Sequence, residues 1–326
     1  MMDLSELGEQ GLIERIRRRI GRKSQDIVVG IGDDACAVKA YSALLTLITT
    51  DAFVEGNHFD LSYFSFKEVG MKAMAASISD VAAMGGVPRY CVVSLLSPPT
   101  ISVADVDGIL DGIEESCDEY GVELVGGDAV GSKSLAISVT VIGEVETENI
   151  ALRSGAKPGD SIFVTGDLGA SEAGRLVLSR GLDLDEDVRA YIVKRHSSPI
   201  PRVKESRELV RNQGIHSMID ISDGLAIDAG HIAQESGVKL VIAVESLPIC
   251  PQVHTVAGAS SATALDMALF GGEDFELLFT AAGLDLKEVG STPITKLGQV
   301  EEGSGVFLVS ADGTESPLLP EGFKHF

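Results

Sequence analysis

The stretch FKEVGMKAMAASISDVAAMGGVPRYCVVSLL, residues 66–96, predicts a helix followed by a strand. Methionine, alanine and isoleucine recur on one side of a helix over residues 66–84, and the run RYCVVSLL at 89–96 is typical of a strand. Asp80 lies on the helix among apolar neighbours, where an uncompensated carboxylate is costly to bury. It therefore either caps something or binds a cation.

Further helical and strand-like segments surround this unit. Upstream we expect a helix and three strands, and downstream a helix and two strands: 4–20, 26–31, 36–40, 44–50, 103–119, 122–126 and 135–145. Their connections are partly hairpin-like and partly crossovers. The sheet of this half is therefore expected to be mixed.

The segment ETENIALRSGAKPG, residues 146–159, is polar and marked by glycine and proline, which is typical of a domain boundary. We place an N-terminal domain at 1–148 and a C-terminal α/β domain at 149–326. Strands and helices alternate in the second domain, as in an α/β layer fold. The expected elements are 161–165, 169–180, 184–196, a helix from about 200, 217–221, 224–236, 238–244, 261–269, 275–280, 294–300 and 305–310.

The composition is that of a globular protein with an unusually acidic charge balance. The 326 residues are 44% hydrophobic and 23% charged, and the formal net charge is −23. Such a charge argues against binding nucleic acid through a broad basic face and against anionic membranes. It does not attract ATP, so a nucleotide site here must carry its own metal ions.

The four cysteines, Cys36, Cys91, Cys117 and Cys250, are widely spaced and form no C-x-x-C motif. This spacing favours buried free thiols over a zinc site or a disulfide framework. The acidic start, MMDLSELGEQ, does not resemble a signal peptide, and no apolar run reaches the roughly 20 residues that span a bilayer. We expect a reduced, cytoplasmic protein.

Acidic residues gather in short segments of small residues, most of which contain glycine. They read GIGDDA (30–35), TTD (49–51), SISD (77–80), VGGDAV (125–130), DISDG (220–224) and FGGED (270–274). Any one of them could be an ordinary Asp-Gly turn. Carboxylates drawn together in space repel one another unless a cation lies between them, and magnesium prefers oxygen ligands. Together the segments predict divalent metal ions held against a polyphosphate.

Several segments carry more specific expectations. In TTD, which is expected to end a strand, Thr50 and Asp51 offer oxygen ligands, and the nearby His58 is either a substrate contact or a structural hydrogen-bonding residue. DISDG is typical of a strand end that turns into a helix whose first amides hold a phosphate, or of an N-cap. Arg153 and Lys157 are candidates for phosphate contacts, or else solvated charges.

The GIGDDA segment is similar to a dinucleotide fingerprint, but two features of its context argue against a dinucleotide site. Asp33 and Asp34 would direct negative charge at a pyrophosphate, and residues 36–50 continue as strand, so no helix N-terminus follows. A Walker A sequence is absent. ATP, if it binds, is not held by a P-loop.

Taken together, the motifs resemble those of the thiamine-monophosphate kinases. The resemblance rests on GIGDDA, TTDAFVEGNHF, KAMAASISDVAAMGGVPR, VGGDAV, RSGAKPGD, IDISDGLAIDAGHI, LFGGEDFELLFT and GFKHF, in this order from about residue 30 to the C-terminus. The chain departs from the pattern after VGGD, where Ala129 and Val130 stand in place of frequent hydroxyl residues, and 181–196 matches poorly.

The resemblance implies a fold of two α/β domains, like that of aminoimidazole ribonucleotide synthetase, with mixed sheets flanked by helices. It implies a homodimer in which the N-terminal sheets pair, so that 1–148 serves ATP and metal binding and dimerisation. It also implies that ATP phosphorylates thiamine monophosphate to thiamine diphosphate by in-line transfer with several Mg²⁺ ions. The acceptor is an ionised phosphate that needs no general base, so we assign none.

The resemblance further implies site residues. Metal ligands would be Asp34, Thr49, Thr50, Asp51, Asp80, Asp128, Asp220 and Asp223. Contacts with ATP would come from Gly127, Asp128, Arg153 and Ser222. His58, Glu273 and Phe323 would contact thiamine, because an acidic group and an aromatic face both suit its thiazolium cation.

Two alternatives remain open. The same fold could serve another ATP-dependent reaction, as in aminoimidazole ribonucleotide or selenophosphate synthetases. The first cysteine, Cys36, follows the GDD motif, which disfavours the selenium enzymes. The chain could also be a nucleotide- or metal-binding module without catalysis.

Overall fold

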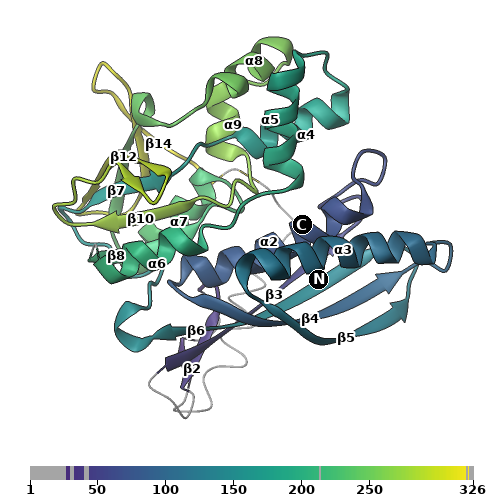
Figure 1. Ribbon diagram of the computed structural model, residues 1–326. Coiled ribbons are helices and arrows are strands. Elements are labelled where there is room, and N and C mark those ends of the chain that lie inside the picture. Colours follow the sequence, from purple (N-terminus) through teal and green to yellow (C-terminus); the bar gives the residue numbers. More distant parts are fainter. Residues whose placement is uncertain (1–26, 30–32, 40–43, 213, 321, 323–326) are drawn as a thin grey trace, which may run out of the picture.

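The computed structural model describes residues 27–29, 33–39, 44–212, 214–320 and 322. The helix expected over 4–20 and the thiamine contact expected at Phe323 lie outside these residues. Within them, strands and helices form two mixed sheets flanked by helices (Figure 1). The predicted α/β class is thereby confirmed.

The first sheet has six strands in the order β1-β2-β3-β6-β4-β5. Their bounds are β1 Ile27–Val29, β2 Cys36–Lys39, β3 Leu44–Val54, β4 Val87–Ser97, β5 Glu123–Gly131 and β6 Ala136–Glu146. β4 and β5 are parallel, and the other described pairs are antiparallel. The mixed sheet expected for this half is confirmed.

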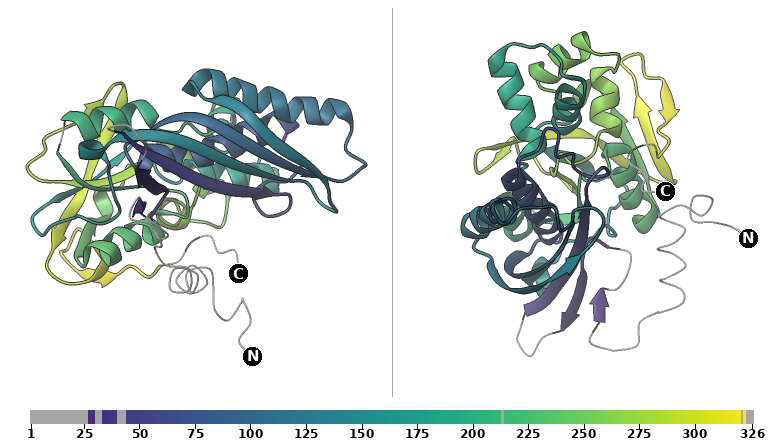
Figure 2. Two further views of the ribbon diagram at one scale, coloured as in Figure 1. Left: turned by 90° about the horizontal axis from the view of Figure 1, so that it is seen from below. Right: turned by 90° about the vertical axis from the view of Figure 1, so that its right-hand side faces the viewer.

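Two helices cover one face of this sheet, α2 (Phe66–Ala83) and α3 (Val103–Tyr120). They cross closely, because a Cβ on Gly70 would lie 2.2 Å from the Ile109 carbonyl oxygen and one on Gly112 would lie 2.0 Å from that of Lys67. The described helices leave the opposite face of the sheet open (Figure 2). α2 is buried on nearly all sides, since it also contacts the second domain.

The second sheet is formed by later strands in the order β14-β13-β9-β12-β7-β10-β8, with β11 paired to β12. The strands are β7 Ser161–Thr165, β8 Ile215–Asp220, β9 Lys239–Ala243, β10 Leu277–Ala281, β11 Glu288–Val289, β12 Thr292–Glu301, β13 Gly305–Val309 and β14 Glu315–Pro317. Side chains alternate between two cores: Ile162 and Val164 pack with α7, whereas Phe163 packs with α6.

The helices of this half are α4 Ala170–Arg180, α5 Glu186–Ser197, α6 Val203–Asn212, α7 Leu225–Ser236, α8 Pro251–Ala259 and α9 Ala264–Phe270, with short 3-10 turns at Thr147–Asn149 and Val244–Ser246. α4, α5, α8 and α9 gather at the top of Figure 1 around a separate apolar cluster. The chain passes from one sheet to the other between β6 and β7. The boundary at residues 148 and 149 stays a prediction.

Two predicted strand ends were wrong. β3 does not end at Asp51 but runs to Val54, and β5 continues through Gly126, Gly127 and Asp128 to Gly131. The cause for β3 is pairing, because β6 matches it residue for residue along its whole length. β5 likewise pairs with β4 as far as Gly131.

One helix of the second domain, α8, was missing from the elements expected from the sequence. α8 was not expected, since PQVHTVAGA is rich in β-branched residues and glycine. Among the described residues, no helix combines the length and the apolar character needed to cross a bilayer.

Candidate functional site

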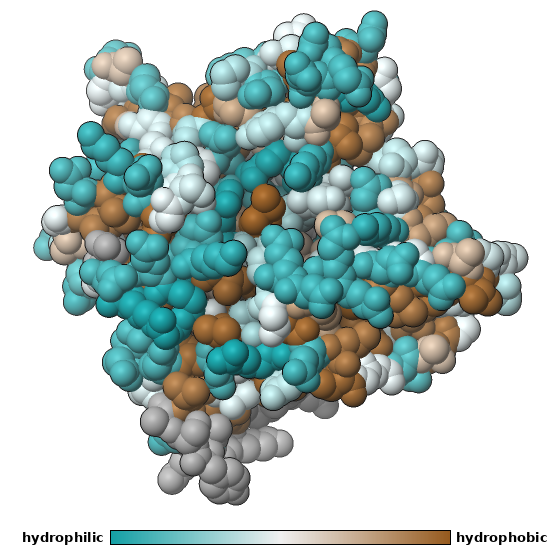
Figure 3. All heavy atoms as spheres, in the orientation of Figure 1, coloured by the Kyte–Doolittle hydropathy of each residue, from teal (hydrophilic) through white to brown (hydrophobic). Residues whose placement is uncertain are grey.

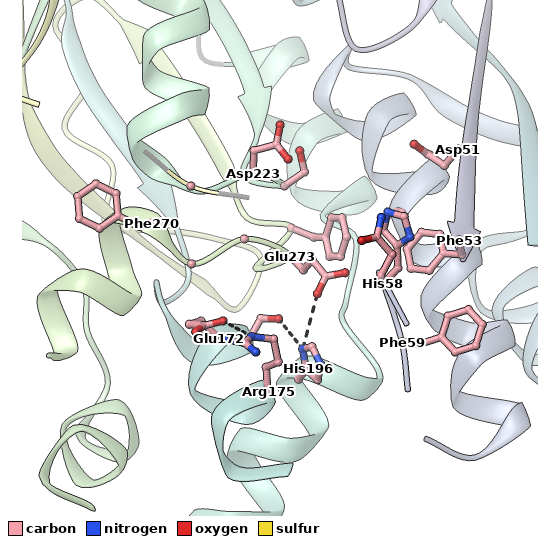
Figure 4. A pocket seen from close by; sticks show the side chains of 18 of the residues that line it. Asp51, Phe53, His58, Phe59, Glu172, Arg175, His196, Asp223, Phe270 and Glu273 are labelled. Atoms are coloured by element: carbon pink, nitrogen blue, oxygen red, sulfur yellow. Dashed lines mark hydrogen bonds and ion pairs between the residues drawn. The ribbon is translucent and has the colours of Figure 1, made fainter. Parts of the chain in front are cut away.

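A cavity of about 1200 Å³ lies between the two domains. It is lined by β3 and α2 from the first domain, and by α4, α5, α7 and α9 and the loops after β8 and α9 from the second. Three of its residues, Asp51, His58 and Glu273, are shown in Figure 4. The cavity has an acidic end at Asp80 and a second end at Glu273.

Three aspartates meet at the acidic end. Asp34, Asp80 and Asp220 each place one carboxylate oxygen within 4.8 Å of the others. They come from the loop before β2, the last turn of α2 and the end of β8. The helix position expected for Asp80 and the strand end expected for Asp220 are both observed. Residues nearly 190 positions apart in sequence therefore converge.

The electrostatics of this cluster favour a cation. Burial, and then the carboxylates of Asp51, Asp220 and Asp34, raises the pKa of Asp80 well above its ordinary value. Burial and Asp34 likewise raise the pKa of Asp220. Three convergent carboxylate oxygens in a buried site match the ligands that a hard divalent ion prefers. The residues therefore fit magnesium.

Hydroxyl groups position these carboxylates. Within the SISD segment of α2, Ser77 Oγ donates to Asp51 at 2.7 Å and Ser79 Oγ donates to Asp220 at 2.6 Å. Thr49 Oγ1 donates to Asp80. One helical turn thus connects the acidic residues of β3, α2 and β8, and it links the two domains at the site.

Arg153 is the cation that the described residues bring to the cluster. Its Nε and Nη2 donate to Asp34 at 3.1 and 2.8 Å. Burial alone lowers the pKa of Arg153, but Asp34 and Asp33 raise it above its ordinary value. Arg153 and His231 both line the cavity. Lys157, the other candidate for phosphate contact, is exposed and outside the cavity lining.

The DISDG loop is stabilised by a residue that the sequence did not single out. The buried Asp228, in the first turn of α7, accepts hydrogen bonds from the backbone amides of Ser222, Asp223 and Gly224 at 3.1, 3.2 and 3.0 Å. From the sequence, DISDG was expected to hold a phosphate with the first amides of the helix or to be an N-cap; the N-cap residue is Gly224, which makes no side-chain cap. The carboxylate of Asp228 takes that place.

We expect Asp228→Ala to lower the free energy of unfolding by about 3 kcal/mol, because three backbone amides lose the buried oxygen that they share as an acceptor. Urea denaturation followed by circular dichroism measures the change. Asp266→Ala is the matched control, since the exposed Asp266 lies in the first turn of α9 and its carboxylate accepts a hydrogen bond from the hydroxyl of the N-cap residue Thr263. Equal losses in the two variants would show that Asp228 does not stabilise the loop.

The second end of the cavity is built on the FGGED loop. Glu273 N–H donates to the Ser222 carbonyl at 2.8 Å, and a Cβ on Gly272 would lie 2.4 Å from the same oxygen. Glycine is required for this approach. The loop therefore lies directly against DISDG and directs Glu273 into the cavity (Figure 4).

A buried network supports Glu273. Lys72 Nζ lies 2.8 Å from Glu273 Oε2 and 3.5 Å from His196 Nδ1, and Ser171 Oγ lies 3.1 Å from the same His196 nitrogen. Burial and the charge of Lys72 lower the pKa of His196 to about 2, so the ring is neutral. Its contact of 3.7 Å with Glu273 is therefore not an ion pair.

His58 and aromatic side chains line the same region. His58 Nδ1 accepts a hydrogen bond from Val54 N–H at 3.0 Å, and its ring centroid lies 5.2 Å from that of Phe53. His58 thus makes a structural hydrogen bond and also lines the cavity, while its contact with a substrate stays a prediction. Arg175 lines the cavity while its guanidinium is paired with Glu172 at 2.7 Å.

Gly127 and Asp128 lie apart from the cavity. In the sheet, Asp51 pairs with Val139, Val139 with Val93, and Val93 with Gly127. Neighbouring strands are about 4.8 Å apart, so three steps place Gly127 about 14 Å from Asp51. Asp128 is exposed on β5 and, one residue on, faces the open side of the sheet.

The other expected ligands lie at the cavity. Thr49, Thr50, Asp51, Asp223 and Ser222 all line it. The Thr50 hydroxyl is engaged with the Val139 carbonyl and Thr140 Oγ1 on the next strand, at 3.2 and 2.9 Å. The oxygen that Thr50 could offer to a metal is therefore its backbone carbonyl.

Sequence reasoning missed the residues that hold others in place: Ser77, Ser79, Lys72, His196 and Asp228. The two serines lie inside a quoted motif, and their positions just before Asp80 were a usable signal. Lys72 also lies in a quoted motif, but a lysine among alanines is typical of a solvated helix face. His196 lies in the segment that matched the family pattern poorly.

Comparison with known proteins identifies two family domains. The AIR synthase related protein N-terminal domain matches residues 32–145, and the corresponding C-terminal domain matches residues 157–311. The thiamine-monophosphate kinase of Aquifex aeolicus is 38% identical over the whole of both chains. That of Bacillus subtilis is 37% identical, over 95% of this chain and 96% of the relative.

Two solved structures are also similar to this chain. AaThiL complexed with AMPPCP and TMP superposes with a TM-score of 0.89 at 37% identity, over 100% of this chain and 99% of that one. A HypE–HypF complex matches at 18% identity with a TM-score of 0.74, covering 94% and 98% of the two chains. The latter likeness concerns the fold alone.

Proposed function

Because the chain belongs to the thiamine-monophosphate kinases, within the AIR synthase related proteins, we propose that it transfers the γ-phosphoryl group of ATP directly to thiamine monophosphate. The products are thiamine diphosphate and ADP. The observation that carries the proposal is the convergence of Asp34, Asp80 and Asp220 at one end of an interdomain cavity.

The acidic end is suited to bringing two phosphate-bearing substrates together. Asp34, Asp80, Asp220 and the adjacent Asp51 would hold several magnesium ions, with Thr49, Thr50 and Asp223 at the same wall. When bound, magnesium supplies the positive charge that screens the repulsion between donor and acceptor phosphates. The acceptor is already ionised, so the chain needs to position it but not to deprotonate it.

The remaining residues divide between the two substrates. Arg153, the cation beside Asp34, and Ser222 on the adjoining loop would contact ATP. Glu273 and His58, at the other end, would contact the thiamine part, whose thiazolium ring carries a fixed positive charge. Phe323 remains a predicted contact with the thiamine part, as the family resemblance implies, because an aromatic face suits the thiazolium cation.

Purified protein with ATP, Mg²⁺ and thiamine monophosphate is expected to form thiamine diphosphate, measured by chromatography after conversion to a fluorescent thiochrome. EDTA is expected to abolish the product, because screening of the two phosphates is lost. An aminoimidazole ribonucleotide precursor is the control acceptor. ADP formed with that compound but not with thiamine monophosphate would contradict the proposal.

We also propose that the enzyme is a homodimer joined through the first sheet. β5 is an edge strand in the described chain, and Leu124, Val125 and Val130 expose apolar side chains along it. Hydrophobic surface is visible at the lower right of Figure 3, where β4 and β5 run. Such an edge favours pairing with a second chain.

A dimer gives Asp128 and Gly127 a place in catalysis. Both lie too far from Asp51 to serve the cavity of their own chain, but they belong to the proposed interface. We therefore propose that they complete the metal and ATP site of the partner subunit.

The cytoplasm remains the proposed location. The described cysteines Cys91, Cys117 and Cys250 are free thiols, as in proteins of reducing compartments.

A further inference from the structure

Lys72 is a fully buried cation placed behind the thiamine end of the cavity. Its side chain has no exposed surface and comes from α2 of the first domain, whereas its partners Glu273 and His196 belong to the second. Its Nζ also lies 5.1 Å from the ring centroid of Phe64. The Lys72 amine therefore lies close to side chains of both domains.

Fold stability alone does not explain such a group. Burying a charge carries a large desolvation cost, and replacing a buried ion pair by apolar residues is often neutral or stabilising. α2 is otherwise packed with alanine, methionine and isoleucine, any of which would suit its core position. A lysine at this position suggests a role in the cavity that its partner lines.

Glu273 is held in a conformation that few residues adopt. Its φ is 62°, in the left-handed region that favours glycine, and its N–H is fixed by the Ser222 carbonyl. The side chain remains 26% exposed and lines the cavity, while Oε2 is held by Lys72. Strained backbone of this kind is concentrated at binding sites.

His196 completes the arrangement from the other side. Lys72 Nζ and Ser171 Oγ both lie within reach of His196 Nδ1, and because a lysine ammonium can only donate, Nδ1 faces it as an acceptor. Lys72 is thus held between a carboxylate and a ring nitrogen. The amine has little freedom to release Glu273.

We propose that Lys72 is a positioning residue for the acceptor substrate: by holding Glu273 Oε2, it presents the carboxylate to the thiamine cation in a fixed orientation. The proposal rests on the proposed function, because it assigns the acceptor to this end of the cavity. A carboxylate that is ordered before binding loses less conformational entropy when the ligand arrives. Lys72 itself need not touch the substrate.

The test is a steady-state comparison of Lys72→Met, Glu273→Gln and the double variant, with folding checked by circular dichroism. We expect each single variant to raise the KM for thiamine monophosphate about tenfold, with the KM for ATP and kcat nearly unchanged. The double variant should be no worse than Glu273→Gln alone, because both changes remove one interaction. Lys67→Met is the control, since Lys67 lies on the same helix in an exposed ion pair with Glu115.

The possible results distinguish a failure of the proposed function from a failure of the role proposed for Lys72. An inactive wild type would overturn the proposed function itself. With an active wild type, multiplicative effects in the double variant, equal losses for both substrates, or a Lys72→Met variant that behaves like Lys67→Met would overturn the role of Lys72. If Lys72→Met does not fold, Lys72→Gln enters the same cycle, since its amide keeps a hydrogen bond but not the charge.

Discussion

Asp80→Asn is expected to lower kcat about 1000-fold, equivalent to about 4 kcal/mol of transition-state stabilisation, because the cluster loses a central charge that would hold the proposed magnesium. The same substitution should increase the thermal stability of the metal-free protein. Without metal, the variant should melt at a higher temperature than the wild type, since a buried carboxylate no longer repels Asp51, Asp220 and Asp34. Thermal unfolding in EDTA measures this difference.

The difference in melting temperature between Asp80→Asn and the wild type should increase as the pH rises. Folding raises the pKa of Asp80, so the stability of the metal-free wild type is greatest when this group is protonated and falls as the pH rises through its folded pKa. Asp80→Asn lacks that loss, and the two melting temperatures should converge at low pH. Asp118→Asn, on the exposed surface of α3, is the control. Reduced stability of Asp80→Asn in EDTA would contradict the repulsion argument.

A heterodimer of one Asp51→Asn subunit and one Asp128→Asn subunit is expected to show about half of wild-type activity, although each homodimer is nearly inactive. If Asp128 serves the partner subunit, the mixed dimer contains one site with both aspartates and one with neither. Two affinity tags allow the mixed dimer to be purified, and thiamine diphosphate formation is then measured per dimer.

The matched control pairs Asp51→Asn with Asp80→Asn, because these residues serve the same cavity of one chain. No site is restored in that heterodimer, and it should remain inactive. Failure of the first heterodimer to recover activity would rule out a role of Asp128 across the interface. A purely monomeric protein in sedimentation would exclude both that role and the proposed dimer.

The acidic cluster was the most predictable part of the candidate site. Acidic residues among small neighbours marked Asp34, Asp80 and Asp220, because a carboxylate on an otherwise apolar helix or at a strand end needs compensation. The helix and strand of residues 66–96 were also predictable, since they are determined by local apolar periodicity.

What depends on contacts between distant segments was not predictable. Gly126-Gly127 is typical of a turn, yet it continues β5, where a Cβ on Gly127 would lie 1.9 Å from the Val93 carbonyl oxygen. Only the neighbouring strand explains Gly127. The same holds for Lys72, whose hydrogen-bonding partners Glu273 and His196 are more than 120 residues away.

The buried helix α2 also acts as a molecular ruler. Lys72, Ala76 and Asp80 follow one another at intervals of four residues along one face, and Ala76 is a wall of the cavity between the two ends. Eight residues of helix span about 12 Å. Because α2 is wedged between α3, the sheet and the second domain, this span cannot stretch, so acceptors would be selected by the separation between their phosphate and their cationic ring.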